Sequence, residues 1–428
     1  MMERYSEYKD SGVKWLGEIP SHWELRKIFG LFSENKRKNT AFLYKHAMQF
    51  NYGTIVDKNE CFDTEETKEI YSNYSLINKG DIVINGLNLN YDFVSQRVAI
   101  SPKNGIITSA YVVISPKVEI NTYFYCYLFK NMDNMKIFHG MGTGVRKTLS
   151  YKELRNHDVL LPPLSEQDAI VRYLDTATSE IDKAIAMQQK MIDLLNERKQ
   201  IIIQNAVTKG LDENVEMKES GVEWIGRIPK HWEVNPLRKY LKVCSKRNMP
   251  DAQLLSVTRE EGVIVRNIES KEENHNYIPD DLSNYKYVQK GQFVINKMKS
   301  WQGSYGVSNY DGIVSPAYFV YDLMYYNKEY FSLAIRSKKF SPFFSKYSKG
   351  IRIDQWDLMP EALKIIPFLE PPVEEQNAIV HFLEDIIPRI NDNITNCQRQ
   401  ITLLQERKQI IINEVVTGKV RVSYPSSG

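Results

Sequence analysis

Two stretches of the chain carry side chains that could recognise base edges of DNA. Residues 85–97 (NGLNLNYDFVSQR) are rich in Asn and Gln, whereas residues 296–303 (NKMKSWQG) carry Lys, Trp and Gln. Asn and Gln can form two hydrogen bonds with adenine, and Arg or Lys can do so with guanine. The stretches would read different bases, through Asn85, Asn88, Asn90, Gln96 and Arg97 in the first and Lys297, Lys299, Trp301 and Gln302 in the second. The alternative is that Asn-rich loops simply tolerate the backbone angles of turns.

Basic residues occur at nearly equivalent positions in the two halves of the chain. They are Lys36, Arg37 and Lys38 in the first half and Lys246 and Arg247 in the second. Arg and Lys suit phosphate contacts, which supply affinity without sequence choice. The alternative is a run of solvated surface charges.

A third pair of segments joins small turn residues to an Arg. Residues 142–149 (GTGVRKTL) contain Arg146 and Lys147, and residues 349–356 (KGIRIDQW) contain Arg352. A loop that cradles a nucleotide phosphate is conceivable, but Gly-Thr-Gly alone is a weak signal and GxGxxG is absent. We therefore favour a loop that faces DNA over a nucleotide site.

The sequence contains no motif that would make the chain an enzyme. Methyltransferase, Walker A and HExxH motifs are absent. A nuclease-like pattern, Pro250-Asp251 followed by residues 269–271 (ESK), keeps only its Glu in the other half, so we interpret it as chance. His22 and His231 each precede a Trp and are expected to pack beside it, because neither has a carboxylate or nucleophile in register. No catalytic residue and no metal ligand is assigned.

Composition restricts the class of protein. The 428 residues are 42% apolar and 25% charged, which is typical of globular proteins, and the net charge of +3 neither requires nor excludes nucleic acid. The four cysteines form no CxxC pair and are expected to be free thiols in a reducing compartment. No stretch approaches eighteen apolar residues and no apolar leader is present, so we expect a cytoplasmic protein with no membrane contact.

The elements that must position these residues are duplicated. Residues 165–209 and 374–418 align without gaps at a separation of 209, and LNERKQI recurs as LQERKQI. Apolar residues at seven-residue spacing predict one long helix in each copy, and each helix needs a partner for its apolar stripe, so we infer that the two pair within the chain. The seam residues are Leu174, Ile181, Leu195 and Ile202 in the first helix and Leu383, Ile390, Leu404 and Ile411 in the second. Ser165 with Asp168 predicts a capping box, and Pro388 a bend.

Each helix is preceded by a Trp-containing motif, which we call the plug, and by a strand-rich block. SGVKWLGEIPSHWEL at residues 11–25 recurs as SGVEWIGRIPKHWEV at 220–234, and short Val, Ile and Tyr runs follow both. Asn104-Gly105 and Asp311-Gly312 place a tight turn at the same point of each half. The halves share a backbone framework and differ in loop length and side chains. This is expected of a protein that recognises two different targets with one scaffold.

These motifs resemble the specificity (S) subunits of type I restriction-modification systems. The resemblance spans the whole chain and is carried by the entries LLPPLSEQ and FLEPPVEEQ, the ERKQ blocks, the exits AVTKGL and VVTGKV, and the two plugs. It implies an α+β fold in which two target recognition domains are separated by two long helices, paired antiparallel as a coiled coil with pseudo-twofold duplication. The expected segments are recognition domains at 1–163 and 212–372, spacer helices at 164–211 and 373–423, and a tail at 424–428.

The resemblance also implies partners and function. Each domain would read one half of a bipartite double-stranded DNA target, and the helices would set the half-site spacing and dock two methyltransferase (modification) subunits. Restriction/translocase subunits would join through these, in a complex that acts as a site-specific deoxyribonuclease and adenine-N6 methyltransferase. S-adenosylmethionine, ATP and Mg²⁺ are expected on the partner subunits, and none on this chain. Two alternatives remain, namely a coiled-coil scaffold whose heads bind proteins and a disguised nuclease or methyltransferase.

Overall fold

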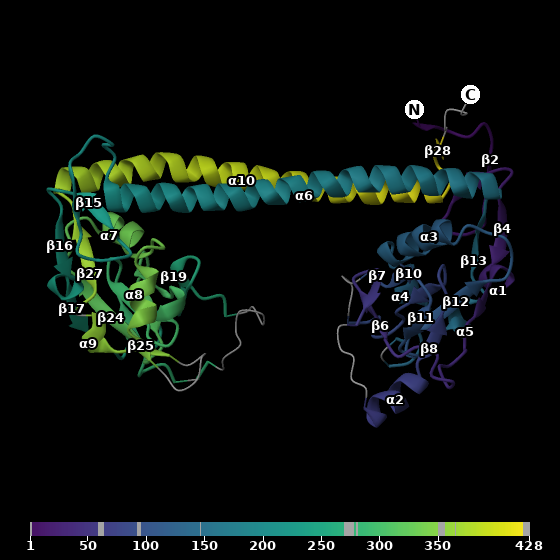
Figure 1. Cartoon of the computed structure of the whole chain (residues 1–428), viewed down its shortest axis with the longest axis horizontal. Coiled ribbons are helices and arrows are strands. Elements are labelled where there is room, and N and C mark those ends of the chain that lie inside the picture. The colour runs from purple at the N-terminus through teal and green to yellow at the C-terminus, as the bar shows by residue number, and fades with distance from the viewer. Residues whose placement is uncertain are drawn as a thin grey trace. The chain divides into compact units, whose positions relative to one another are not determined.

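The computed structural model describes residues 2–58, 64–91, 96–145, 147–268, 278–279, 281–349, 356–363 and 365–422. The chain divides into two compact units, residues 1–188 with 399–428 (unit 1) and residues 189–398 (unit 2). Two long helices, α6 (Leu164–Lys209) and α10 (Val373–Val416), each contribute one portion to each unit (Figure 1). The predicted α+β fold with a duplicated long helix is confirmed, and the division between the units falls within the helices.

Each unit contains a four-stranded antiparallel sheet of the same topology. In unit 1 the order is β10-β9-β12-β5, with β5 (Phe32–Glu34), β9 (Ile82–Ile84), β10 (Val98–Ile100) and β12 (Val112–Pro116). In unit 2 the order is β22-β21-β24-β17, with β17 (Leu241–Cys244), β21 (Phe293–Asn296), β22 (Tyr305–Val307) and β24 (Tyr318–Leu323). The duplication seen in the sequence is therefore also a duplication of sheet topology.

Shorter two-stranded pairs surround each sheet. In unit 1 they are β1 (Met2–Glu3) with β28 (Arg421–Val422), β2 (Tyr8–Asp10) with β3 (Glu18–Pro20), β4 (Glu24–Lys27) with β13 (Asp158–Leu161), β6 (Met48–Asn51) with β7 (Thr54–Asp57), and β8 (Ser75–Ile77) with β11 (Gly105–Ile107). In unit 2 they are β14 (Met217–Glu219) with β15 (Arg227–Pro229), β16 (Glu233–Pro236) with β27 (Pro367–Glu370), β18 (Leu255–Thr258) with β19 (Gly262–Val265), β20 (Lys286–Val288) with β23 (Gly312–Val314), and β25 (Ser348–Lys349) with β26 (Asp357–Leu358). Strands β11 and β23 begin at the glycines of the two predicted turns.

Short helices complete the units. They are α1 (Ile28–Leu31), α2 (Glu65–Ser72), α3 (Thr122–Asn134), α4 (Ile137–Met141) and α5 (Tyr151–Leu154) in unit 1, and η1 (Leu237–Lys239), η2 (Ser300–Gln302), α7 (Lys328–Ile335), α8 (Ser341–Lys346) and α9 (Pro360–Leu363) in unit 2. Local capping explains where the two matched helices begin: Asn121 accepts the amides of Tyr123 and Phe124, and Asn327 accepts that of Tyr330.

The long helices pair antiparallel within each unit. In unit 1 the start of α6 and the end of α10 share one core, and Lys408 Nζ lies 2.6 Å from Asp182 Oδ1. In unit 2 the end of α6 and the start of α10 share the other core, and Lys199 Nζ donates to Asn391 Oδ1 at 3.1 Å. Lys199 and Lys408 are 209 residues apart, as are Asp182 and Asn391, so the two contacts are equivalent under the internal repeat.

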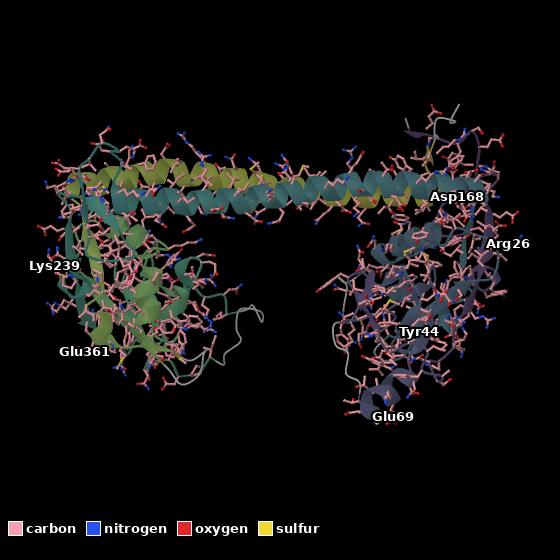
Figure 2. All side chains as sticks on the ribbon, in the orientation of Figure 1. Arg26, Tyr44, Glu69, Asp168, Lys239 and Glu361 are labelled. Atoms are coloured by element: carbon pink, nitrogen blue, oxygen red, sulfur yellow. The ribbon has the colours of Figure 1, made fainter. Side chains whose placement is uncertain are left out.

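The seam residues lie along this pairing. Leu174, Ile181, Leu383 and Ile390 are buried, and Leu195, Ile202, Leu404 and Ile411 are half-buried. Helix α10 runs without interruption through Pro388, which is exposed. The predicted capping box does not form, because α6 begins at Leu164 and Ser165 lies within the helix. Asp168, labelled in Figure 2, accepts instead from Asn121 Nδ2 at 2.7 Å.

Each plug forms hydrogen bonds with the first turn of one long helix. Trp23 and Trp232 are fully buried, and each donates its indole N–H to a glutamate, Glu166 at 3.0 Å and Glu375 at 2.9 Å. His22 Nε2 lies 2.7 Å from Glu166, and His231 contacts Glu375 in the same way. The expectation that each His packs beside its Trp holds, but the statement that neither has a carboxylate partner is wrong, because the helix supplies one.

Candidate nucleic-acid interface

In unit 1 the fold brings two predicted segments to one edge of the main sheet. Strands β5 and β9 both run antiparallel to β12, so they are parallel to each other and their carboxyl ends meet at the same edge. Residues 36–38 follow β5 and residues 85–97 follow β9. Lys36, Arg37 and Lys38 are exposed there. We call this end of the sheet, with residues 36–38, 85–91, 96–97, 142–145 and 147–149, the unit 1 edge.

Two loops of the unit 1 edge are joined into one surface. The amide of Leu89 donates to Lys147 O at 3.1 Å, and the amide of Leu149 donates to Gly86 O at 2.9 Å. Asn90 Nδ2 donates to Val145 O at 3.1 Å. A Cβ atom on Gly86 would lie 2.1 Å from Leu149 O, so only glycine permits this approach. The described parts of the two predicted segments, 85–91 and 142–149 without residue 146, thus form a composite surface.

The predicted base-reading residues of unit 1 do not all face solvent. Asn88 and Gln96 are exposed, Asn85 and Asn90 are half-buried, and Lys147 is exposed. Arg97 is the exception, since only 1% of it is accessible. Its guanidinium donates to the carbonyls of Asn85 and Leu87, so it stabilises the loop from the buried side and is not accessible to a base. The prediction of Arg97 as a base reader is corrected accordingly.

Unit 2 repeats the arrangement with different side chains. Strands β17 and β21 are both antiparallel to β24, so residues 246–247 and 297–303 emerge at one edge, which we call the unit 2 edge. Lys246, Arg247 and Lys299 are exposed, and Lys297, Trp301 and Gln302 are half-buried. The predicted residues of this half are again gathered by the sheet.

The unit 2 edge includes a pair of indole rings. The ring centroids of Trp301 and Trp356 lie 5.2 Å apart, and Ser345 Oγ donates to Trp301 O at 3.1 Å. Lys297 Nζ lies 2.9 Å from Asp357 Oδ2, beside the same pair. The tilted indole pair offers apolar ring surface, whereas the Asn-rich edge of unit 1 offers amide groups. The two edges therefore present different chemistry from equivalent positions.

Sequence reasoning missed one cation of the unit 2 edge. Lys286, at the start of β20, donates its Nζ–H to Tyr318 O at 2.5 Å. Partial burial lowers the pKa of this ammonium, and the positive charges of Arg247 and Lys297 lower it further. Three cations that repel one another at one edge favour a polyanionic ligand. The run of mixed residues around Lys286 carries no pattern that would have singled it out.

Several predicted residues lie outside the described residues. These are Arg146, Arg352 and the nuclease-like residues 269–271. Among the described residues, no group of three or more His, Cys, Asp or Glu side chains could hold a metal ion. In the same part of the chain, no helix is long and apolar enough to cross a membrane. Cys126, Cys244 and Cys397 are free thiols.

A second surface lies on the long helices. Leu194 and Ile201 of α6 are 51% and 50% exposed, and Leu403 and Ile410 of α10 are 54% and 56% exposed. Residues seven apart share one helix face, so each helix carries an exposed apolar pair besides its buried seam. The pairs are 209 residues apart and therefore equivalent under the repeat. Exposed apolar pairs of this kind are typical of surfaces that receive another helix.

Comparison with known proteins gives concordant results. The family model described as type I restriction modification DNA specificity domain matches residues 20–190. The chain is 26% identical to the type I restriction enzyme MjaVIII specificity subunit of Methanocaldococcus jannaschii, over 97% of each chain. Its fold matches, with a TM-score of 0.68 and 12% identity, a chain from a solved structure that describes complex assembly and conformational transition of the type I R-M system. That match covers 93% of this chain and 98% of the other.

Proposed function

Since this chain belongs to the specificity subunits of type I restriction-modification systems, we propose that each unit reads one half of a bipartite, asymmetric DNA target. The observation that carries the proposal is the pair of edges at equivalent positions of two identical sheet topologies. Equivalent positions give both edges the same approach to a duplex, and unlike side chains give them different base preferences.

Phosphate contacts and base contacts come from different residues of each edge. The exposed cations Lys36, Arg37 and Lys38 in unit 1, and Lys246 and Arg247 in unit 2, hold the backbone without choosing sequence. Asn88 and Gln96 in unit 1 and Lys299 in unit 2 are exposed on the adjoining loops and read base edges. This division gives affinity to one set of residues and selectivity to the other.

The long helices set the spacing of the two half-sites. Helix α6 joins the body of unit 1 to that of unit 2 without a break, and α10 returns to unit 1. Helices of about 45 residues at roughly 1.5 Å per residue are about 67 Å long, so we propose that their length limits the half-site spacing to about two turns of B-DNA, each of about 34–36 Å. In this proposal the length of the paired helices fixes the number of bases between the half-sites.

The exposed apolar pairs dock two methyltransferase subunits. Leu194 with Ile201 and Leu403 with Ile410 are duplicated by the repeat, so two copies of one partner can bind in equivalent ways. S-adenosylmethionine, ATP and Mg²⁺ bind those partners and the restriction subunits that they bring. In this assignment the chain itself carries no catalytic group.

Duplex binding tests the reading function. The chain, purified with its methyltransferase partner, is expected to select short duplexes from a random pool, and its affinity is expected to fall as salt rises. A pool that emerges without enriched sequence, or binding that salt does not weaken, would instead favour a scaffold whose heads bind proteins. Methylation or cleavage of DNA by the chain without partners would favour a disguised enzyme.

Matched substitutions test the docking function. Leu194→Glu and Leu403→Glu lie on exposed positions, so each should change the free energy of unfolding by less than about 0.5 kcal/mol. Each should remove one partner copy, and the double variant both, as measured by the mass of the purified complex. Thr402→Glu, at an exposed polar position one residue before Leu403, is the control and should keep both copies.

A further inference from the structure

Arg97 is a buried cation in contact with the carbonyls of one loop. Nη1 donates to Asn85 O at 3.1 Å and to Leu87 O at 2.7 Å, and Nη2 reaches Asn88 O at 3.5 Å. The side chain is 1% exposed. Burial of a guanidinium costs several kcal/mol unless its donors are used, and Arg97 uses both Nη1 and Nη2 on the carbonyls of this loop.

The loop that Arg97 holds has an unfavourable backbone. Asn88 has a φ of 53°, in the left-handed region that non-glycine residues seldom adopt. The next residue, Leu89, is buried and turns into the core of unit 1, while Asn88 itself is exposed. While these carbonyls face one guanidinium, the side chain of Asn88 is exposed and those of Asn85 and Asn90 are half-buried. The orientation of residues 85–91, which we call the reading loop, therefore depends on the guanidinium of Arg97.

Arg97 is itself anchored from the other side. Its backbone amide donates to Asp133 Oδ2 at 2.7 Å, at the end of α3. Burial raises the pKa of Asp133, while the hydrogen bond from Arg97 acts in the opposite direction. Helix α3 also contacts α10 through Asn131, whose Nδ2 donates to Asn413 Oδ1 at 3.0 Å. A chain of contacts thus connects the reading loop to the long helix within unit 1.

Unit 2 contains a guanidinium in a comparable role. Arg336, directly after α7, donates from Nη1 to Tyr305 O at 2.6 Å and from Nη2 to Glu260 O at 2.7 Å. Burial lowers the pKa of this group. The turn that it holds, between β18 and β19, lies beside Gly303 at the end of the reading segment, because a Cβ there would be 3.9 Å from Arg259 Cγ. Arg336 is not the repeat counterpart of Arg97, so the two units place an arginine under their loops from different parts of the chain.

We propose that Arg97 is a positioning residue for sequence selection by unit 1, and that Arg336 serves unit 2 in the same way. The inference rests on the proposed function, because it assumes that the two edges read DNA. It adds that selectivity depends on two guanidinium groups, buried at Arg97 and half-buried at Arg336, that do not touch a base. Loss of such a group should relax selection at one half-site only, since each arginine contacts loops of its own unit.

The test uses the full chain with its methyltransferase partner and the target found by mapping methylated adenines. The measured quantity is the ratio of methylation rates on the target and on duplexes with one base changed, taken separately for each half-site. Arg97→Lys keeps a positive charge but has fewer donors and no fork geometry. It should lower the ratio at the unit 1 half-site by about tenfold and leave the other ratio unchanged. Arg336→Lys should do the reverse.

Arg26→Lys is the matched control. Arg26, labelled in Figure 2, is exposed on β4 and pairs with Glu24 at 3.0 Å, so neither ratio should change. Hydrogen exchange separates positioning from folding. In Arg97→Lys the amides of Leu89 and Leu149, which bond across the two loops, should exchange faster, while those of β9 and β12 stay protected.

Three results would overturn the inference: an unchanged ratio at the unit 1 half-site, an equal fall at both half-sites, or loss of protection throughout unit 1. The last two would assign Arg97 to folding alone. If the unaltered complex shows no preference at either half-site, the proposed function itself fails, and that outcome is visible before any variant is made.

Discussion

The two edges use the same sheet to present unlike surfaces. In unit 1 the edge is built from Asn-rich loops that are bonded to each other through backbone groups, with Gly86 at their closest approach. In unit 2 the edge carries the tilted ring pair of Trp301 and Trp356 and the neighbouring cations Lys286 and Lys297. The strands that position them have the same order and direction. The comparison shows that the framework is fixed by the strands and that recognition is free to change in the loops.

The largest effect is expected from exchange of a whole block. Residues 26–158 contain the unit 1 edge and leave the plug and α6 in place. Replacing them with the same block of a relative should change one half of the methylated target completely and leave the other half unaltered. Sequencing of methylated adenines measures this. A change in both halves would show that the edges are not independent.

A smaller effect is expected at the junction of the two unit 1 loops. Gly86→Val would place a branched side chain against Leu149 O, so we expect a loss of about 2 kcal/mol in the free energy of unfolding of unit 1. Selection at the unit 1 half-site should weaken, and unit 2 should be unaffected. Gly30→Ala, where an added Cβ meets no atom within 4 Å, is the control. Equal stability of the two variants in thermal unfolding would contradict this account of the junction.

A cation at the unit 2 edge should have a smaller effect still. Lys286→Gln removes one of three neighbouring positive charges and should weaken DNA binding a few-fold on all sequences. The slope of log affinity against log salt should fall by about 1. Lys230→Gln, on the plug and paired with Glu216, should leave the slope as it is. An unaltered slope for Lys286→Gln would place this lysine outside the interface.

The smallest expected effect is a difference in the free energy of unfolding between matched variants of the two plugs. Glu166 accepts from Trp23 and also from Tyr5 Oη at 2.8 Å, and burial together with Glu166 raises the pKa of that tyrosine. The repeat counterpart of Tyr5 is Asn214, whose amide donates to Asp212 Oδ1. Glu166→Gln should therefore lower the free energy of unfolding by about 1 kcal/mol more than Glu375→Gln. Chemical denaturation of both variants measures the difference, and a larger loss for Glu375→Gln would reverse this ranking.

Much of the fold could be predicted because the sequence contains it twice. The period of 209 residues and the heptad spacing of Leu174 to Ile202 predict the helices without any tertiary information. The contacts that could not be predicted are long-range. Glu166 meets His22 across 144 residues, and no local pattern links them, although the same separation between Glu375 and His231 is a signal that the repeat made available.

The candidate site could be predicted in outline and not in detail. The sequence pattern predicts loops after short strands, and the observed strand pairing shows that the two strands are parallel, which gathers these loops at one edge. Whether a side chain on such a loop turns outward depends on its neighbours. Arg97 follows the Asn-rich segment in the sequence and has the right chemistry for guanine, yet the carbonyls of Asn85 and Leu87 draw it inward. Lys286 was not predicted, because its position beside Arg247 and Lys297 depends on contacts between residues that are distant in sequence.

Mapping of methylated adenines in DNA from cells that carry this chain with its methyltransferase partner tests the central claim most directly. Because the two edges differ in side chains and share one framework, the account predicts a target of two unlike defined blocks, separated by a constant number of unspecified bases. A single uninterrupted block, two identical blocks, or methylation without sequence preference would contradict it.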